Sequence, residues 1–217
     1  MPDFNTLRTM MVDTQIRPSD VTKYPIIQAM LDVPREKYVP EGKRAAAYAG
    51  DDIEIADNRV ILAPRTFAKL LDALDIQPDE LVLDLGCGLG YSSAIIARLA
   101  EAVVAVEEIP GMAAEAQSLL SANDVDNVAV IEGSLSEGAA KHGPYDVIVI
   151  EGAIECLPQA IADQLKDGGR IGCLFMTGNL GEAKVGLKLD GEITWRFAFN
   201  ASAPVLKEFR KKMEFML

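Results

Sequence analysis

The chain has 217 residues, of which 49% are hydrophobic and 25% are charged, a composition typical of one globular domain with at most a small addition. Its formal net charge of −12 disfavours nonspecific attraction to phosphate backbones and anionic lipid, so we expect neither a nucleic-acid nor a membrane partner. No segment approaches the roughly 18 apolar residues that a membrane-spanning helix needs. The first eight residues lack the apolar core of a signal peptide.

The cysteine and histidine content indicates the cellular compartment and argues against a metal centre. Three widely spaced cysteines without a C-x-x-C pair are typical of reduced thiols. The single histidine, His142, lies in a turn-like stretch without a second metal ligand at useful spacing. We therefore expect a soluble cytoplasmic protein without a bound metal. The sequence does not indicate an oligomeric state.

The first 64 residues are predicted to be mainly helical. Apolar spacing predicts helices at 5–15 and 19–32, the second beginning at a serine that can cap it. Residues 51–63 show poor periodicity and precede a proline, so we expect an irregular connection that leads into a helix at 66–74. This pattern predicts a helical N-terminal extension with a substrate-side segment at 1–64, and a main domain at 65–217.

From residue 80 onward, short apolar runs alternate with helical segments, as in βαβ units around a parallel sheet. An Asp-Gly pair between two further runs predicts an antiparallel C-terminal hairpin. The expected fold is an α/β, Rossmann-like open sheet, mostly parallel, with helices on both faces. The expected strands are 81–85, 102–107, 128–131, 146–150 and 170–175, the helices are 91–99, 111–122 and 155–165, and the hairpin pairs 184–189 with 193–199.

A glycine loop follows the first of these strands, at the edge of the sheet where ligands bind in open α/β folds. Gly86, Gly88 and Gly90 are spaced as G-x-G-x-G after Asp84, so backbone N–H groups can face a ligand without hindrance from Cβ atoms. The dinucleotide fingerprint is instead G-x-G-x-x-G. The loop therefore favours S-adenosyl-L-methionine (SAM) over NAD as cofactor. Further candidates to bind the cofactor here are Cys87, Tyr91 and Ser92.

Polar residues at the ends of the next strands complete the predicted cofactor site. Glu107 ends the second strand, where a carboxylate can accept hydrogen bonds from ribose hydroxyls. Ser134, after the third strand, is expected beside the adenine, and Glu151, after the fourth, at the mouth of the cleft. The remaining candidates are Glu108 and Gly133.

SAM chemistry limits the acceptors that this site can serve. Transfer of the sulfonium methyl group is an in-line displacement, which mainly requires a well-oriented nucleophile. A carboxylate acceptor is already anionic, whereas a hydroxyl usually requires a general base or a metal. The lone histidine therefore favours a carboxylate acceptor on a peptide, a protein or a small molecule, although a Glu or Lys could serve as base. An NAD-dependent oxidoreductase is disfavoured by the loop spacing and by the absence of an obvious Tyr/Lys or His/Asp catalytic set.

Several segments together resemble the protein-L-isoaspartate (D-aspartate) O-methyltransferase family. The most specific are Val-Pro-Arg-x-x-Tyr-Val-Pro at 33–40 and Glu-x-Ile-Pro at 107–110, joined by the glycine loop region at 82–93 and by 145–149 and 164–170. The resemblance covers most of the chain. It implies a SAM-dependent enzyme that repairs damaged proteins by methylating the isoaspartyl α-carboxylate.

The chain departs from this family at two positions. The family's Thr-Ile-Ser-x-Pro stretch corresponds to 60–64, where Leu62 replaces a serine whose hydroxyl lies near the acceptor. The family's Gly-Asp-Gly corresponds to 133–135, where Ser134 replaces the acid. Arg59 and Thr66 are the remaining candidates for acceptor binding. The alternatives are a SAM-binding protein whose acceptor activity is lost or changed, and a methyltransferase for another acceptor.

Overall fold

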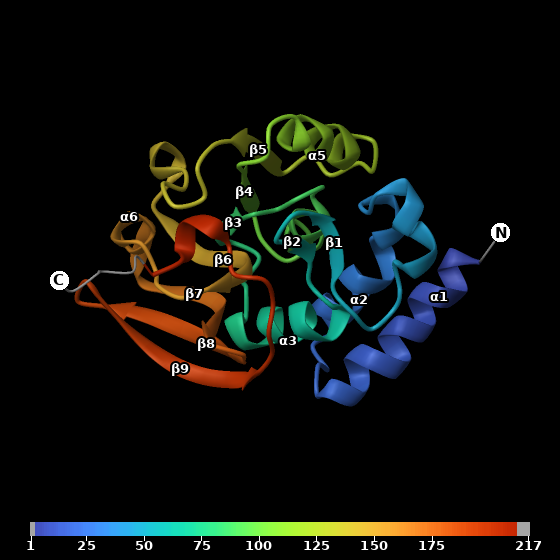
Figure 1. The fold of residues 1–217 in the computed structure, drawn as a ribbon, viewed down its shortest axis with the longest axis horizontal. Coiled ribbons are helices and arrows are strands. Elements are labelled where there is room, and N and C mark those ends of the chain that lie inside the picture. Colours follow the sequence, from blue (N-terminus) through green and yellow to red (C-terminus); the bar gives the residue numbers. More distant parts are fainter. Residues whose placement is uncertain (1–2, 212–217) are drawn as a thin grey trace.

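Residues 3–211 are described by a computed structural model, and most of them surround one large sheet. This sheet has seven strands in the order β5-β4-β3-β6-β7-β8-β9, and a separate small sheet pairs β1 with β2 (Figure 1). The strands of the large sheet are β3 (Leu81–Leu85), β4 (Ala102–Glu107), β5 (Val128–Glu132), β6 (Tyr145–Ile154), β7 (Leu165–Thr177), β8 (Leu180–Leu189) and β9 (Glu192–Asn200).

The sheet confirms the predicted Rossmann-like fold. Strands β3 to β7 pair in parallel, whereas β7, β8 and β9 pair antiparallel and form the expected C-terminal hairpin. Its tight turn uses Asp190 and Gly191, both with positive φ, as a two-residue hairpin turn requires. Because β3 has β4 on one side and β6 on the other, the strand order reverses there. A crevice for a ligand is expected at the carboxyl ends of these strands.

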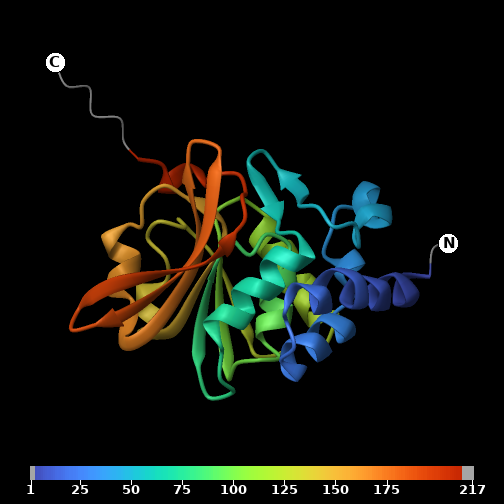
Figure 2. The same cartoon turned by 90° about the horizontal axis from the view of Figure 1, so that it is seen from below.

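Successive residues of a strand point to opposite faces, so the sheet supports two apolar clusters. The larger lies against α3 (Pro64–Leu74), α4 (Tyr91–Ile96) and α5 (Met112–Ser121). The smaller lies against α6 (Gln159–Asp163) and the 3₁₀ turn Lys207–Phe209. Seen from below, α3 and the N-terminal helices cover one side of the sheet and α6 the other (Figure 2). Helices on both faces are thereby confirmed.

The N-terminal helices differ in length from the prediction. Helix α1 (Phe4–Met11) continues as a π-helical turn over Val12–Ile16. Helix α2 (Tyr24–Asp32) begins five residues later than the predicted start at residue 19, because Asp20 adopts a left-handed conformation with φ of 66°. Both helices contribute side chains to the larger apolar cluster. The division of the chain at residue 64 stays a prediction.

Two expected elements are corrected by the structure. Residues 51–63 were expected to be irregular, but they contain a hairpin of β1 (Ile53–Ala56) and β2 (Arg59–Ile61), closed by a turn at Asp57 and Asn58. Asn58 has φ of 55°, a conformation that asparagine tolerates better than most residues. The helix expected at 155–165 shortens to α6, because β6 continues to residue 154 and Pro158 precedes the helix.

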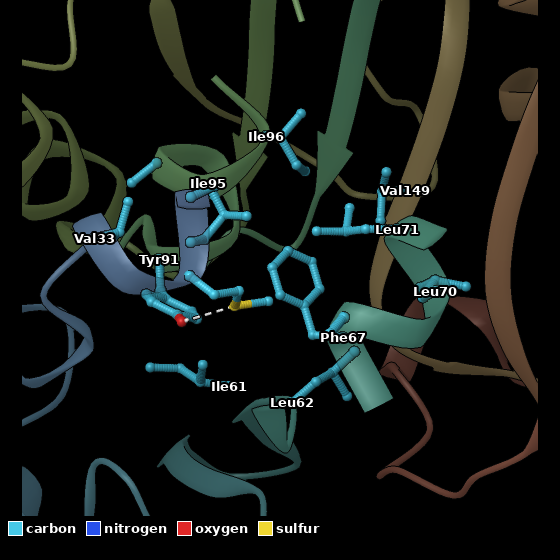
Figure 3. Packing of buried hydrophobic residues seen from close by; sticks show 14 of the residues in the cluster. Val33, Ile61, Leu62, Phe67, Leu70, Leu71, Tyr91, Ile95, Ile96 and Val149 are labelled. Carbon is cyan, nitrogen blue, oxygen red and sulfur yellow. Dashed lines mark hydrogen bonds between the residues drawn. The ribbon is translucent and has the colours of Figure 1, made fainter. Parts of the chain in front are cut away.

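Leu62, which follows β2, lies in the apolar core. Its side chain is only 1% exposed and belongs to the larger cluster, beside Phe67 of α3 (Figure 3). Its carbonyl oxygen accepts a hydrogen bond of 2.9 Å from Arg35 Nη2. The position that holds the family's serine therefore contributes packing in this chain.

We predict that Leu62→Ala lowers the free energy of unfolding by about 2–5 kcal/mol, the usual cost of such a truncation in a core. Leu62→Ser should cost at least as much, because burying a hydroxyl without a partner adds about 1–3 kcal/mol. Urea unfolding measures both values. As a control, Leu180→Ala at an exposed position should change stability by no more than about 0.5 kcal/mol. A Leu62→Ser protein as stable as the parent would contradict this account.

Candidate cofactor and acceptor site

The glycine loop at 86–90 lies at the carboxyl end of β3 and is held against β4. Gly86, Gly88 and Gly90 have φ values of 84°, 58° and 93°, which residues with a Cβ rarely adopt. The Gly86 N–H donates to the carbonyl oxygen of Val106 at 2.8 Å, and the Gly88 N–H donates to Glu107 Oε2 at 2.8 Å. The sequence therefore uses glycine where the turn after β3 has to fold back onto the end of β4.

Asp84 forms the floor of this loop. Its Oδ2 accepts hydrogen bonds from the hydroxyls of Ser92 and Ser93, at 2.7 and 2.6 Å, while its Oδ1 is buried without a partner. Burial raises the pKa of Asp84 to about 6, against the lowering effect of the two hydroxyls. Ser92, a predicted cofactor residue, thus supports Asp84 through its side chain.

The side chains of two other predicted loop residues, Tyr91 and Cys87, are buried. Tyr91 is buried in the larger apolar cluster, where its hydroxyl lies 3.4 Å from the sulfur of Met30 (Figure 3). Cys87 is buried as well, and burial raises the pKa of its thiol well above the ordinary value. Neither side chain is placed as a nucleophile. Their contribution to a cofactor site would come from the backbone.

Glu107, the predicted ribose ligand, is fully buried at the end of β4 and paired with Arg59 of β2. Arg59 Nη1 donates to Oε1 at 2.8 Å and Nη2 donates to Oε2 at 2.6 Å, a bidentate pair. The N–H groups of Ile109 and Gly88 donate to the same two oxygens, at 2.9 and 2.8 Å. The sequence predicts Arg59 as an acceptor residue, and in the structure its guanidinium pairs with Glu107, the predicted ribose ligand.

The β1–β2 hairpin lies directly over the glycine loop. A Cβ added to Gly86 would lie 3.2 Å from Arg59 Nη2, and one added to Gly88 would lie 2.5 Å from the terminal carbon of Ile55. Both glycines are therefore required for this close approach as well as for their backbone conformation. The hairpin was missed by the sequence analysis, and it forms the roof of the site.

Glu151, in β6, is buried with its Oε1 unpartnered. Burial and the nearby charge of Asp84 raise its pKa well above the ordinary value, and the positive charges of Arg35 and Arg59 oppose this rise. Arg35 is itself fully buried and has an Nη1 without a partner. Asp52, whose carboxylate accepts the Ala63 N–H at 2.6 Å, is close enough to Arg35 for the two charges to interact.

Arg35 and Asp52 were not among the predicted site residues. The only signal for Arg35 was its place in the Val-Pro-Arg motif at 33–40, which carried the family resemblance.

The side of the site expected to hold the adenine is covered by the C-terminal segment. The Gly133 N–H donates to the carbonyl oxygen of Glu107 at 3.0 Å. The Ser134 hydroxyl donates to Glu208 Oε2 at 2.8 Å, and the Ser136 N–H donates to the same oxygen at 2.9 Å. Glu208 therefore supplies a carboxylate to the loop in which Ser134 replaces the family's acid.

Glu108 follows Glu107 and lies nearer the surface, with 24% of its side chain exposed. Its Oε1 lies 3.4 Å from Arg59 Nη1, and partial burial raises its pKa. It lines a surface cavity of about 500 Å³ together with the hairpin turn and the C-terminal segment. The residues lining this cavity are Asp57, Asn58, Arg59, Glu108, Ile109, Pro110, Lys207 and Arg210.

The structure does not bring the three predicted acceptor residues together at one polar surface. Leu62 packs in the core, Arg59 pairs with Glu107, and Thr66 is buried in α3 with 8% of its surface exposed. Their roles toward an acceptor stay predictions. One set of buried charged groups lies around Asp84, Glu107 and Glu151, and another, the pair of Arg8 and Glu36, lies in the N-terminal segment.

The residues present fit SAM in type and position. A carboxylate lies at the end of β4, the glycine loop brings backbone without Cβ atoms close to it, and the buried oxygens of Asp84 and Glu151 lack partners. Unpartnered buried polar atoms in a native site call for a ligand, a water or a functional role. The one conflict is that Glu107 is already engaged by Arg59.

Comparisons with known proteins agree with the predicted fold and with the family resemblance. The sequence model of the family described as protein-L-isoaspartate(D-aspartate) O-methyltransferase matches residues 7–177. A protein-L-isoaspartate O-methyltransferase of Methanoregula boonei is 37% identical over 164 residues, which cover 76% of this chain and 76% of the relative. One of Methanocella arvoryzae is 44% identical over 142 residues, which cover 64% of this chain and 76% of the relative.

Solved structures share the fold at low sequence identity. A protein-L-isoaspartate O-methyltransferase structure superposes with a TM-score of 0.78 at 21% identity, covering 93% of this chain and 65% of that chain. A Plasmodium falciparum structure in complex with S-adenosyl-L-homocysteine gives a TM-score of 0.79 at 19% identity, covering 96% of this chain and all of that one.

We predict that Asp84 makes folding less favourable as the pH rises from about 4 to 6. Its pKa is raised from 3.8 in the unfolded chain to about 6 in the folded protein, so the folded state holds the proton through this window. Relative to Asp84→Asn, the wild type should therefore lose stability between these pH values and change no further above them. Urea unfolding at pH 4.5, 6 and 7.5 measures this difference. The exposed control Asp79→Asn should follow the wild type, and parallel curves for Asp84→Asn would refute the assignment.

Proposed function

This chain belongs to the protein-L-isoaspartate (D-aspartate) O-methyltransferase family of SAM-dependent enzymes, and we propose that it methylates the isoaspartyl α-carboxylate of damaged proteins. The observation that carries this proposal is the family match across residues 7–177, which includes the whole crevice from Arg35 to Glu151. Protein repair in the cytoplasm is the proposed setting. The three free thiols, Cys87, Cys156 and Cys173, support a reducing compartment.

The cofactor half of the site is built from the ends of three neighbouring strands. Glu107 would accept hydrogen bonds from the ribose, the glycine loop would allow the ligand to approach the backbone closely, and Asp84 and Glu151 would supply the unpartnered oxygens. When bound, SAM supplies an electrophilic methyl group on a sulfonium cation. The floor of the site is rich in carboxyl groups, those of Asp84, Glu107 and Glu151, which suits a ligand that carries a cationic centre and several hydrogen-bond donors.

An isoaspartyl acceptor makes few chemical demands on this site. A carboxylate is an anionic nucleophile, so the protein has to orient it rather than deprotonate it. The thiol of Cys87 and the hydroxyl of Tyr91 are buried away from such a role. Arg35 Nη1, which is buried without a partner, is the group that we propose to attract the acceptor carboxylate.

Leu62 favours a second candidate function. Since its side chain lies in the core, it offers no hydroxyl to an isoaspartyl group, and a different carboxylate on a peptide or small molecule would then be the acceptor. Both candidates share the cofactor and the methyl ester product. They differ only in the molecule that carries the carboxylate.

The proposal is tested with tritiated SAM and two peptides of one sequence, one with an isoaspartyl and one with an ordinary aspartyl residue. We predict label in the isoaspartyl peptide only, released by mild base as expected for a methyl ester. Asp84→Asn should reduce the rate at least tenfold because it alters the floor of the cofactor site, whereas Asp79→Asn should not. Base-labile label in a cell extract but in neither peptide would favour the second candidate. No labelling in any mixture would overturn methyl transfer altogether.

A further inference from the structure

The carboxylate of Glu107 has no hydrogen-bonding capacity left. Two carboxylate oxygens offer about four lone-pair directions in all. Oε1 accepts from Arg59 Nη1 and the Ile109 N–H, and Oε2 accepts from Arg59 Nη2 and the Gly88 N–H, all between 2.6 and 2.9 Å. A ribose hydroxyl can therefore bind Glu107 only if one of these donors leaves. The two N–H groups are fixed by the backbone, so the donor that can leave is Arg59.

The hairpin that carries Arg59 also covers the glycine loop with a second side chain, that of Ile55. Ile55 of β1 lies so close to Gly88 that no Cβ fits between them. A ligand that approaches the glycine loop from this side meets the side chains of both Ile55 and Arg59. The two side chains that obstruct cofactor binding, Arg59 and Ile55, therefore both belong to the β1–β2 hairpin.

The hairpin can move without breaking the main sheet. Strands β1 and β2 pair only with each other and form a sheet of their own. Among the described residues, the hydrogen bonds from Lys43 Nζ to the backbone oxygen and carboxylate of Glu54 lie at its exposed edge. The side chains of Ile53, Val60 and Ile61 belong to the larger apolar cluster, so the movement is confined to the tip at Asp57 and Asn58 and to the side chain of Arg59 beside it.

Arg59 has a second carboxylate within reach. Glu108 Oε1 already lies 3.4 Å from Arg59 Nη1, at the border of the 500 Å³ surface cavity that Arg59 also lines. Breaking a buried ion pair outright leaves an uncompensated charge, which is strongly unfavourable. A shift from Glu107 to Glu108 keeps the guanidinium paired as it moves toward solvent, while the ribose hydroxyls replace its two hydrogen bonds at Glu107 beside those from the Gly88 and Ile109 N–H groups.

We propose that the β1–β2 hairpin is a latch on the cofactor site, in which Arg59 holds Glu107 when the site is closed and transfers to Glu108 when the ribose of the cofactor binds Glu107. This proposal rests on the proposed function, since it concerns access to the same site. SAM and Arg59 compete for one carboxylate. The apparent association constant for SAM equals the intrinsic constant multiplied by the fraction of molecules whose latch is open.

The latch is tested by titration calorimetry with SAM and with S-adenosylhomocysteine. Arg59→Gln removes the competing cation, and Ile55→Ala opens the space above Gly88 without changing any charge. We expect Arg59→Gln to lower the dissociation constant at least tenfold, and Ile55→Ala to lower it by a smaller factor. Arg44→Gln, the same change at an exposed arginine outside the hairpin, should leave it unchanged. Combining Arg59→Gln with Glu107→Ala should abolish the gain.

The binding results decide between the latch, its absence and failure of the proposed function. Equal affinity in wild type, Arg59→Gln and Ile55→Ala overturns the latch but leaves the proposed function standing. Weaker binding by Arg59→Gln also overturns it, because Arg59 would then be part of the cofactor-bound site. If no variant binds either ligand while all unfold cooperatively on heating, the proposed function itself fails and the latch with it. Should Arg59→Gln not fold, Ile55→Ala alone decides between tighter and unchanged binding.

Discussion

The ion pair between Arg59 and Glu107 is the interaction on which the rest of the site depends. Their side chains are 4% and 0% exposed, and the shorter of their two hydrogen bonds is 2.6 Å long. Removing one member of such a buried pair typically costs about 3–5 kcal/mol, since the other charge stays buried alone. The pair joins two elements that are distant in sequence, the β1–β2 hairpin and the end of β4. It thereby fixes the roof of the crevice over the glycine loop.

The charges around this pair explain why the crevice retains unpartnered polar atoms. Burial raises the pKa of both Asp84 and Glu151, and the charge of Asp84 raises the pKa of Glu151 further, as the charge of Glu107 does for Asp84. Arg35 and Arg59 offset this acidity only in part, and each has one buried nitrogen without a partner. A core selected for stability alone would satisfy or replace such groups. Their concentration at the ends of β3, β4 and β6 is better explained by the binding of a charged ligand.

The sequence predicts the repetitive part of this structure well. Alternating apolar runs and helices locate all five parallel strands, and the position of Glu107 at a strand end follows from that pattern alone. The apolar pattern does not predict the β1–β2 hairpin, because strands of four and three residues are too short to show alternation. The pairing of Arg59 with Glu107 is not predictable from the pattern for another reason. Glu107 lies 48 residues from Arg59, and only the tertiary fold shows which carboxylate the guanidinium reaches.

The segment of the predicted acceptor residues is also the segment that carries Arg59. Strand β2 begins at Arg59 and leads directly to Leu62, whose carbonyl oxygen binds Arg35 and whose side chain fixes this segment in the core. The family's serine position and the cation that engages Glu107 are therefore three residues apart on one segment. In the proposed latch, Leu62 is the fixed end of the hairpin, because moving it would leave a cavity in the core. The tip at Asp57 and Asn58 is then the end that moves.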